Sequence, residues 1–221
     1  MCGRYSLTSK LDNLQARFDF EAENLAYRPR YNVAPTQEVL AVVNDGQNRA
    51  GFLRWGLVPF WAKDTRIGSR MINVRAETVA EKPAFRQALR KRRCLVLADG
   101  FYEWKKEGGA KVPMYIASRS GEPFGMAGLW ETWKAPSGES LHSCAIITTA
   151  ANSLMEPIHD RMPVILTQEA EATWLDTGID DPGALTRLLV PCPAAELEAY
   201  PVSTLVNSPR NDAPECLLRA G

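Results

Sequence analysis

The chain has 221 residues, of which 45% are hydrophobic, enough apolar material for the core of a single domain spanning residues 1–221. It contains no run of about 18 apolar residues that could cross a membrane, and its cysteines lack the spacing of a zinc site. We therefore expect a reduced, cytoplasmic protein without a metal or another cofactor. A net charge of zero argues against a generally basic nucleic-acid-binding protein, so any binding to DNA must use a local patch.

Short strands dominate the elements predicted in chain order. Apolar spacing behind Thr8 and Ser9 predicts a first helix, and the turn sequences Asn44-Asp45-Gly46 and Asp99-Gly100 each predict a hairpin. The predicted strands are 38–43 paired with 51–55, 93–97 paired with 101–105, 112–117 paired with 124–130, and 143–149. The predicted helices are 9–20, 83–90, 167–175 and 182–189. This order favours an α+β domain around a mixed, strongly curved, barrel-like sheet with flanking helices.

Charge is distributed unevenly along the chain. Basic residues far outnumber acidic ones between Arg54 and Arg93, whereas acidic residues predominate after Glu169. The basic stretch also contains Phe60 and Trp61, and a groove for single-stranded nucleic acid needs cations for phosphates and aromatic faces for bases. A solvated helix face beside a few core aromatic residues would give the same composition.

Cysteine occupies position 2, directly after Met1. Removal of Met1 would give Cys2 a free α-amine and a thiol on adjacent carbons, with reference pKa values of about 7.7–8.0 and about 8.5. The amine can condense with an aldehyde to an imine, and the thiol can then close a thiazolidine ring. Considered alone, the dipeptide favours the more common structural cysteine over a nucleophile.

Two further patterns of polar residues are compatible with a catalytic site. Asn73, Arg75 and Glu77 alternate, so they share one face of an extended segment, although a solvent-facing strand would look the same. Glu103 lies between aromatic neighbours, and an apolar setting would raise its pKa and suit it to proton transfer. A strand with Glu103 facing water fits the local sequence as well.

His159 is one of only two histidines and lies in a predicted loop between Pro157 and Pro163. Histidine is the side chain best suited to general acid–base catalysis near neutral pH, and a loop position of this kind seldom holds a core residue. The other histidine, His142, lies in a polar stretch and is predicted to be on the surface.

Taken together, these segments resemble the signature blocks of the SRAP family, the SOS response-associated peptidases. Each block alone is weakly specific, but the ordered set is highly specific and covers residues 2 to about 212. The blocks are Cys2-Gly3-Arg4-Tyr5, residues 30–35, residues 54–61, residues 73–78, residues 98–104, residues 158–163, and the C-terminal residues 201–212.

The resemblance implies a protein that binds single-stranded DNA at abasic sites and links Cys2 to the ring-opened sugar as a thiazolidine. The implied catalytic residues are Cys2, Asn73, Glu103 and His159. The implied DNA-binding residues are Arg4, Asn32, Pro35, Trp61, Arg75 and Arg161. It further implies loss of Met1 with peptidase or lyase character, a monomer, and a cytoplasmic protein that joins the nucleoid on DNA and has no membrane partner. Some members carry two tryptophans where this chain has only Trp61.

Two other functions remain open from the residues alone. Glutamine amidotransferases with an N-terminal cysteine also begin Met-Cys-Gly, but they need an Arg-Gly-Pro-Asp type block that this chain lacks. A noncovalent single-stranded DNA-binding module is the second, and in that case Glu103 and His159 would have no chemical role.

Overall fold

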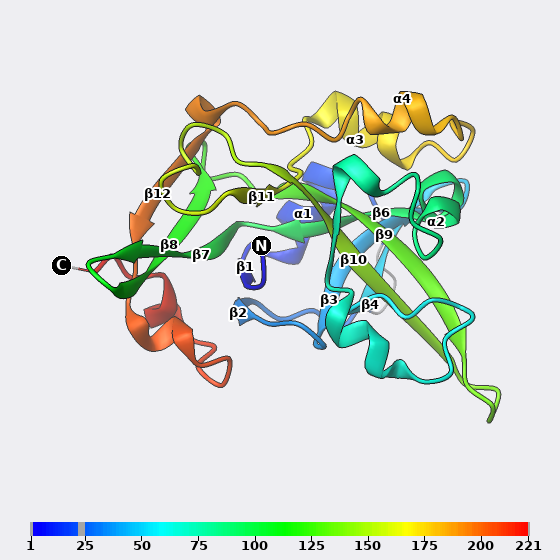
Figure 1. Ribbon diagram of the computed structural model, residues 1–221, viewed down its shortest axis with the longest axis horizontal. Helices are drawn as coiled ribbons and strands as arrows, with labels where there is room; N and C mark the ends of the chain where they lie inside the picture. The colour runs from blue at the N-terminus through cyan, green and yellow to red at the C-terminus, as the bar shows by residue number, and fades with distance from the viewer. Residues whose placement is uncertain (1, 22–24, 221) are drawn as a thin grey trace.

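The computed structural model describes residues 2–21 and 25–220, and within them the strands form two sheets (Figure 1). The strands are β1 (Tyr5–Leu7), β2 (Arg30–Val33), β3 (Glu38–Asn44), β4 (Asn48–Trp55), β5 (Asn73–Arg75), β6 (Arg93–Ala98), β7 (Gly100–Glu107), β8 (Ala110–Ser118), β9 (Phe124–Lys134), β10 (Ser140–Ala150), β11 (Arg161–Pro163) and β12 (Leu197–Pro201). The helices are α1 (Leu11–Phe18), α2 (Arg86–Lys91), α3 (Gln168–Leu175) and α4 (Pro182–Thr186), with 3-10 turns η1 (Thr65–Arg70), η2 (Ala76–Thr78), η3 (Ala194–Glu196), η4 (Thr204–Asn207) and η5 (Pro214–Leu217).

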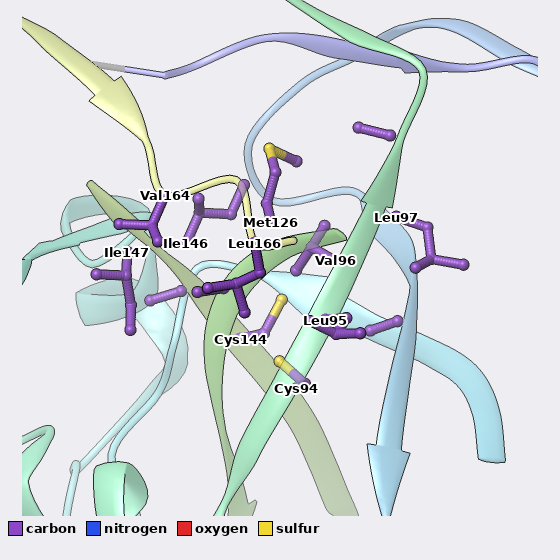
Figure 2. Packing of buried hydrophobic residues seen from close by; sticks show 14 of the residues in the cluster. Cys94, Leu95, Val96, Leu97, Met126, Cys144, Ile146, Ile147, Val164 and Leu166 are labelled. Atoms are coloured by element: carbon purple, nitrogen blue, oxygen red, sulfur yellow. The ribbon is translucent and has the colours of Figure 1, made fainter. Parts of the chain in front are cut away.

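The larger sheet closes on itself as a barrel. Its strand order is β11-β10-β4-β3-β6-β9, and the additional pairing of β9 with β10 completes the ring. Every residue of β6 is buried, and helix α3 covers this strand through a hydrogen bond from Trp174 Nε1 to the carbonyl of Cys94 at 3.0 Å. Figure 2 shows the side chains of β6 packing with Met126, Cys144 and Ile146 in the core. The expected barrel-like, mixed sheet with flanking helices is therefore confirmed.

The smaller sheet has the order β12-β8-β7-β1-β2, and all of its pairings are antiparallel. A C-terminal segment, residues 202–217, packs beside it. Tyr102 and Tyr115 of the sheet form a second small core with Val202, Val206 and Cys216 of this segment. No helix in the described residues is long and apolar enough to cross a membrane.

The predicted hairpin around Asn44-Asp45-Gly46 and all four predicted helices are present, with helix ends shifted by a few residues. The strand pair predicted around Asp99-Gly100 is wrong, because β6 and β7 belong to different sheets. The Asp99 carboxylate accepts hydrogen bonds from the backbone and hydroxyl groups of Thr8 and Ser9. These contacts hold Asp99 at the point where the chain passes from β6 in one sheet to β7 in the other.

The pair predicted between residues 112–117 and 124–130 is also wrong, because β8 pairs with β7 and β9 pairs with β6 and β10. The turn that the pattern missed joins β7 to β8. It contains Gly108 and Gly109, whose φ values of 57° and 83° favour glycine over residues with a side chain.

A candidate active site between the two sheets

Cys2 lies a short distance before β1, which begins at Tyr5, and is fully buried. Its backbone carbonyl accepts a hydrogen bond of 2.7 Å from the side-chain amide of Asn73, which belongs to the other sheet. Burial raises the pKa of the Cys2 thiol well above its ordinary value, and the nearby Glu103 carboxylate raises it further. The thiol is therefore protonated at neutral pH in this structure.

Asn73 is placed by the parallel pairing of β5 with β10, in which it lies opposite Ile146. Val74 is buried between the more accessible Asn73 and Arg75, as the alternating pattern predicted. The prediction is wrong for Glu77, because the strand ends at Arg75 and Glu77 lies in the 3-10 turn η2 rather than on an extended segment. The Oδ1 atom of Asn73 is buried and has no hydrogen-bond partner among residues 2–21 and 25–220. An unpaired buried acceptor is costly, so this atom is suited to receive a donor from a ligand at Cys2.

Glu103 lies on β7 and is only 4% exposed, so the structure rules out the alternative in which it faces water. Burial raises the pKa of its carboxyl group, the direction that the aromatic neighbours predicted. The charge of His159 opposes this shift, and the charge of Asp160 adds to it. These influences reflect the proximity of Glu103, on β7 of the smaller sheet, to His159, in the loop before β11.

His159 precedes β11 and its side chain is 28% exposed. Its Nδ1 atom accepts a hydrogen bond of 3.0 Å from the backbone N–H of Arg161 and lies 2.9 Å from a carboxylate oxygen of Asp160. A neutral imidazole that accepts at Nδ1 carries its proton on Nε2. A protonated ring can instead pair Nδ1–H with Asp160, so both states have a partner.

The side chain of Arg161 is held in place by Glu77. Its guanidinium donates to the two Glu77 carboxylate oxygens at 2.6 and 2.9 Å and to the carbonyl of Thr148 at 2.6 Å. These hydrogen bonds lower the pKa of Glu77, which η2 carries next to β5. The side chain of Glu77 is 52% exposed and that of Arg161 is 14% exposed, so the carboxylate is the more solvent-accessible partner of this pair.

Arg4 is held by the β2 strand and the C-terminal segment. Its NH1 atom donates to Asn32 Oδ1 at 2.8 Å and to the carbonyl of Val206 at 2.6 Å, and its guanidinium lies 5.7 Å from the ring centre of Trp104. Asn32 is fully buried, and its Nδ2 group faces the carbonyls of Val206, Ser208 and Asn211. Asn32 thus offers no exposed group to DNA as it stands and instead positions Arg4.

The other predicted DNA-binding residues lie nearer the surface. Trp61 is 52% exposed and follows Phe60, which is 58% exposed, on the turn after β4. Pro35 is half-buried, and the exposed side chain of Arg75 has no ion pair or hydrogen bond to another described residue. His142 is exposed, as predicted.

The two sheets therefore bring together a thiol, an amide, a buried carboxyl group and an imidazole: Cys2, Asn73, Glu103 and His159. The described residues contain no group of three His, Cys, Asp or Glu side chains arranged to hold a metal ion. Sequence reasoning missed the Glu77–Arg161 pair and the support that Val206 gives to Arg4. The C-terminal block, residues 201–212, contains Val206 and could have indicated its support of Arg4, but no role was assigned to this block.

Comparison with known proteins places this arrangement in a family. Residues 1–209 match the family model described as "SOS response associated peptidase (SRAP)". The chain is 52% identical over 221 residues to the abasic site processing protein YoqW of Bacillus subtilis, covering 98% of this chain and 99% of that protein. It is 32% identical over 262 residues to the abasic site processing protein HMCES of Xenopus tropicalis, covering 98% and 78%. A crystal structure of a Bacteroides thetaiotaomicron protein superposes with a TM-score of 0.91 at 31% identity, covering 99% of this chain and 100% of that one.

Proposed function

The chain belongs to the SRAP family, and from that premise we propose that it binds single-stranded DNA at abasic sites and couples Cys2 covalently to the lesion as a thiazolidine. The observation that carries the proposal is the position of Cys2, which is hydrogen bonded to Asn73 and electrostatically coupled to Glu103. The names of the relatives, which are abasic site processing proteins, support the DNA lesion as the substrate.

The first step requires a free amine on Cys2. Removal of Met1 would supply it by hydrolysis, and Met1 lies outside the described residues. The amine nitrogen attacks the C1′ aldehyde carbon of the ring-opened sugar, and the adduct loses water to give an imine. His159 or the protonated Glu103 donates the proton that turns the departing hydroxyl into water, since burial keeps Glu103 protonated to higher pH than usual.

The second step closes the ring. The sulfur of Cys2 bonds to the imine carbon, the C=N bond becomes a single bond, and the nitrogen takes up a proton. Because burial raises the thiol pKa, the sulfur must lose its proton as it attacks, and neutral His159 is the base we assign to this transfer. Asn73 holds the Cys2 backbone and offers its unpaired Oδ1 to the ring nitrogen.

The DNA strand is held from outside this centre. Arg75 and Trp61 are exposed and supply a cation for a phosphate and a face for a base, and the half-buried Pro35 offers a further apolar contact. Arg4, two residues from Cys2 in the chain, and Arg161 are assigned to DNA phosphates, and Asn32 acts through Arg4. The same proposal makes the protein a cytoplasmic monomer that joins the nucleoid on DNA. The imine intermediate also accounts for lyase character, and the loss of Met1 accounts for the peptidase name.

Intact mass spectrometry tests the proposal. The protein is mixed with uracil-containing single-stranded DNA that has been treated with uracil glycosylase. We expect a mass equal to protein plus DNA minus one water, dependent on the abasic site. Cys2→Ser should abolish this adduct, whereas Cys192→Ser, which changes another buried cysteine, should retain it. An equal yield from Cys2→Ser would refute the thiazolidine, and ammonia release from glutamine would instead support an amidotransferase.

A further inference from the structure

The β7–β8 hairpin carries a row of cationic and aromatic side chains that begins next to the proposed site. Successive residues of a strand point to opposite faces, so Trp104 and Lys106 lie on the face opposite Glu103. Arg4 joins this row through its backbone carbonyl, which accepts from the N–H of Tyr102 at 2.9 Å, and through its stacking on Trp104. Lys111 of β8 lies directly opposite Lys106.

The Lys106–Lys111 pair is unusual in the sheet. Like charges placed directly opposite each other destabilise a strand pair. Both side chains are exposed, and neither has an ion pair or hydrogen bond with another described residue. The neighbouring Lys105 differs, because its amine lies 3.5 Å from a carboxylate oxygen of Glu107. Two facing ammonium groups kept free of carboxylates are suited to a polyanion.

A hollow of about 250 Å³ is lined by Trp104, Lys111 and Asn207, so it adjoins one lysine of the pair. The indole N–H of Trp104 donates to Asn207 Oδ1 at 2.7 Å, which leaves the amide NH₂ of Asn207 without a partner among the described residues. A flat aromatic side chain beside a free amide donor is suited to a nucleobase, which stacks on the ring and accepts a hydrogen bond.

We propose that Arg4, Trp104, Lys106, Lys111 and Asn207 form a second nucleic-acid surface, the hairpin platform, that binds the single-stranded flank on one side of the abasic site. The inference rests on the proposed function and extends its site. Phosphates lie on Lys106 and Lys111, and a base enters the hollow beside Trp104. In Figure 1 the hairpin extends to one side of β1, and β4 with the following basic segment lies on the other. The two surfaces would thus hold opposite flanks.

Fluorescence anisotropy can test the platform with an unreactive tetrahydrofuran abasic analogue placed near the 5′ end or near the 3′ end of a labelled single strand. The Lys106→Gln/Lys111→Gln variant is compared with Lys10→Gln/Lys134→Gln, which removes two other exposed lysines. For the oligonucleotide whose flank reaches the platform, we expect several-fold weaker binding. The slope of log K against log salt should become shallower by about 1.4, because each neutralised phosphate of a single strand accounts for about 0.7 of that slope.

The opposite oligonucleotide, and the control variant on both oligonucleotides, should bind as the unchanged protein does. Unchanged affinity and slope on both oligonucleotides, or equal losses on both, would overturn the platform. The two hypotheses can be tested separately. Adduct formation by the unchanged protein tests the proposed function alone, whereas the anisotropy comparison tests the hairpin platform.

Discussion

Asn73 donates a hydrogen bond of 2.7 Å from its side-chain amide to the backbone carbonyl of Cys2. This contact joins the small sheet, which continues from Cys2 into β1, to the barrel, which carries Asn73 on β5. The nucleophile is therefore positioned by both sheets, and changes on either side should affect its chemistry in distinguishable ways.

Asn73→Ala should slow crosslinking by about tenfold or less, because a net hydrogen bond is worth about 0.5–1.5 kcal/mol. The larger effect should be a shorter half-life of the adduct, since the amide also contacts the closed ring. Both quantities can be followed by denaturing gel electrophoresis over time. Asn13→Ala, which changes an exposed asparagine of α1, is the control. An adduct as durable as that of the unchanged protein would contradict this role.

Glu103→Gln should slow crosslinking by about 10²–10⁴, the usual contribution of general acid–base catalysis. Noncovalent binding to DNA should change little. A structure-preserving variant with an unchanged rate would remove Glu103 from the proton transfers. His159→Ala should give a loss in the same range, and its measurement in parallel shows whether the two residues act as a pair.

Glu103 should also affect stability in a pH-dependent way. Burial raises its folded-state pKa above the unfolded value of about 4.3, so its contribution to stability is complete at low pH and is lost as pH rises through the raised pKa. Glutamine cannot ionise, and Glu103→Gln should gain in Tm relative to the unchanged protein as pH increases above about 4. A Tm difference that does not vary with pH would contradict this assignment.

Glu77→Gln should show the opposite pH dependence. Arg161 lowers the pKa of Glu77, so the stability from this pair is present above the unfolded value of about 4.3 and is lost as pH falls through the lowered pKa. The variant should therefore be less stable than the unchanged protein at neutral pH and equal to it in acid. Thermal unfolding across this range measures the difference. Glu81→Gln, which removes another exposed carboxylate, is the matched control.

Trp61→Ala should weaken binding to single-stranded DNA by about 1–3 kcal/mol, the usual loss of one stacked base. Because Trp61 is 52% exposed, Tm should be almost unchanged. Fluorescence anisotropy and thermal unfolding test the two halves of this prediction. Phe52→Ala removes another exposed aromatic residue, 37% exposed on β4, and should not weaken binding. Equal losses from both variants would argue against a specific stacking position.

Asn32→Ala should destabilise the fold by about 1–3 kcal/mol in urea unfolding, because it leaves Arg4 and several buried carbonyls without a partner. It should also weaken DNA binding through Arg4. A double-mutant cycle with Arg4→Ala separates the two effects. If Asn32 acts only through Arg4, then adding Arg4→Ala to the Asn32 variant should cost little further affinity.

The sequence predicted local features well. Turn residues after β3 and apolar spacing in the helices indicated the correct elements, because these signals depend on near neighbours. Strand pairing was predicted poorly around Asp99-Gly100, since this dipeptide resembles a turn. The outcome depends on Thr8 and Ser9, which are about 90 residues away and supply the donors for the Asp99 carboxylate.

The candidate site shows the same division. The residue types of Glu103 and His159 suggested proton transfer. Nothing local indicated that Glu103, on a strand of the smaller sheet, would lie near His159, in the loop before β11. Asn32 is the clearest example, because its buried position becomes apparent only when Val206 and the following carbonyls are in place. The resemblance to a family identified the position and did not distinguish direct contact with DNA from support of Arg4.

The hydrogen bond from Arg4 to the carbonyl of Val206 spans 202 positions of the chain. During translation Arg4 leaves the ribosome 202 residues before its partner does. The contacts of Arg4 therefore cannot be completed before Val206 has emerged. A nascent chain that has not yet exposed Val206 therefore lacks the finished support of Arg4 beside Cys2. The order of synthesis delays the assembly of the site around the Cys2 thiol and amine.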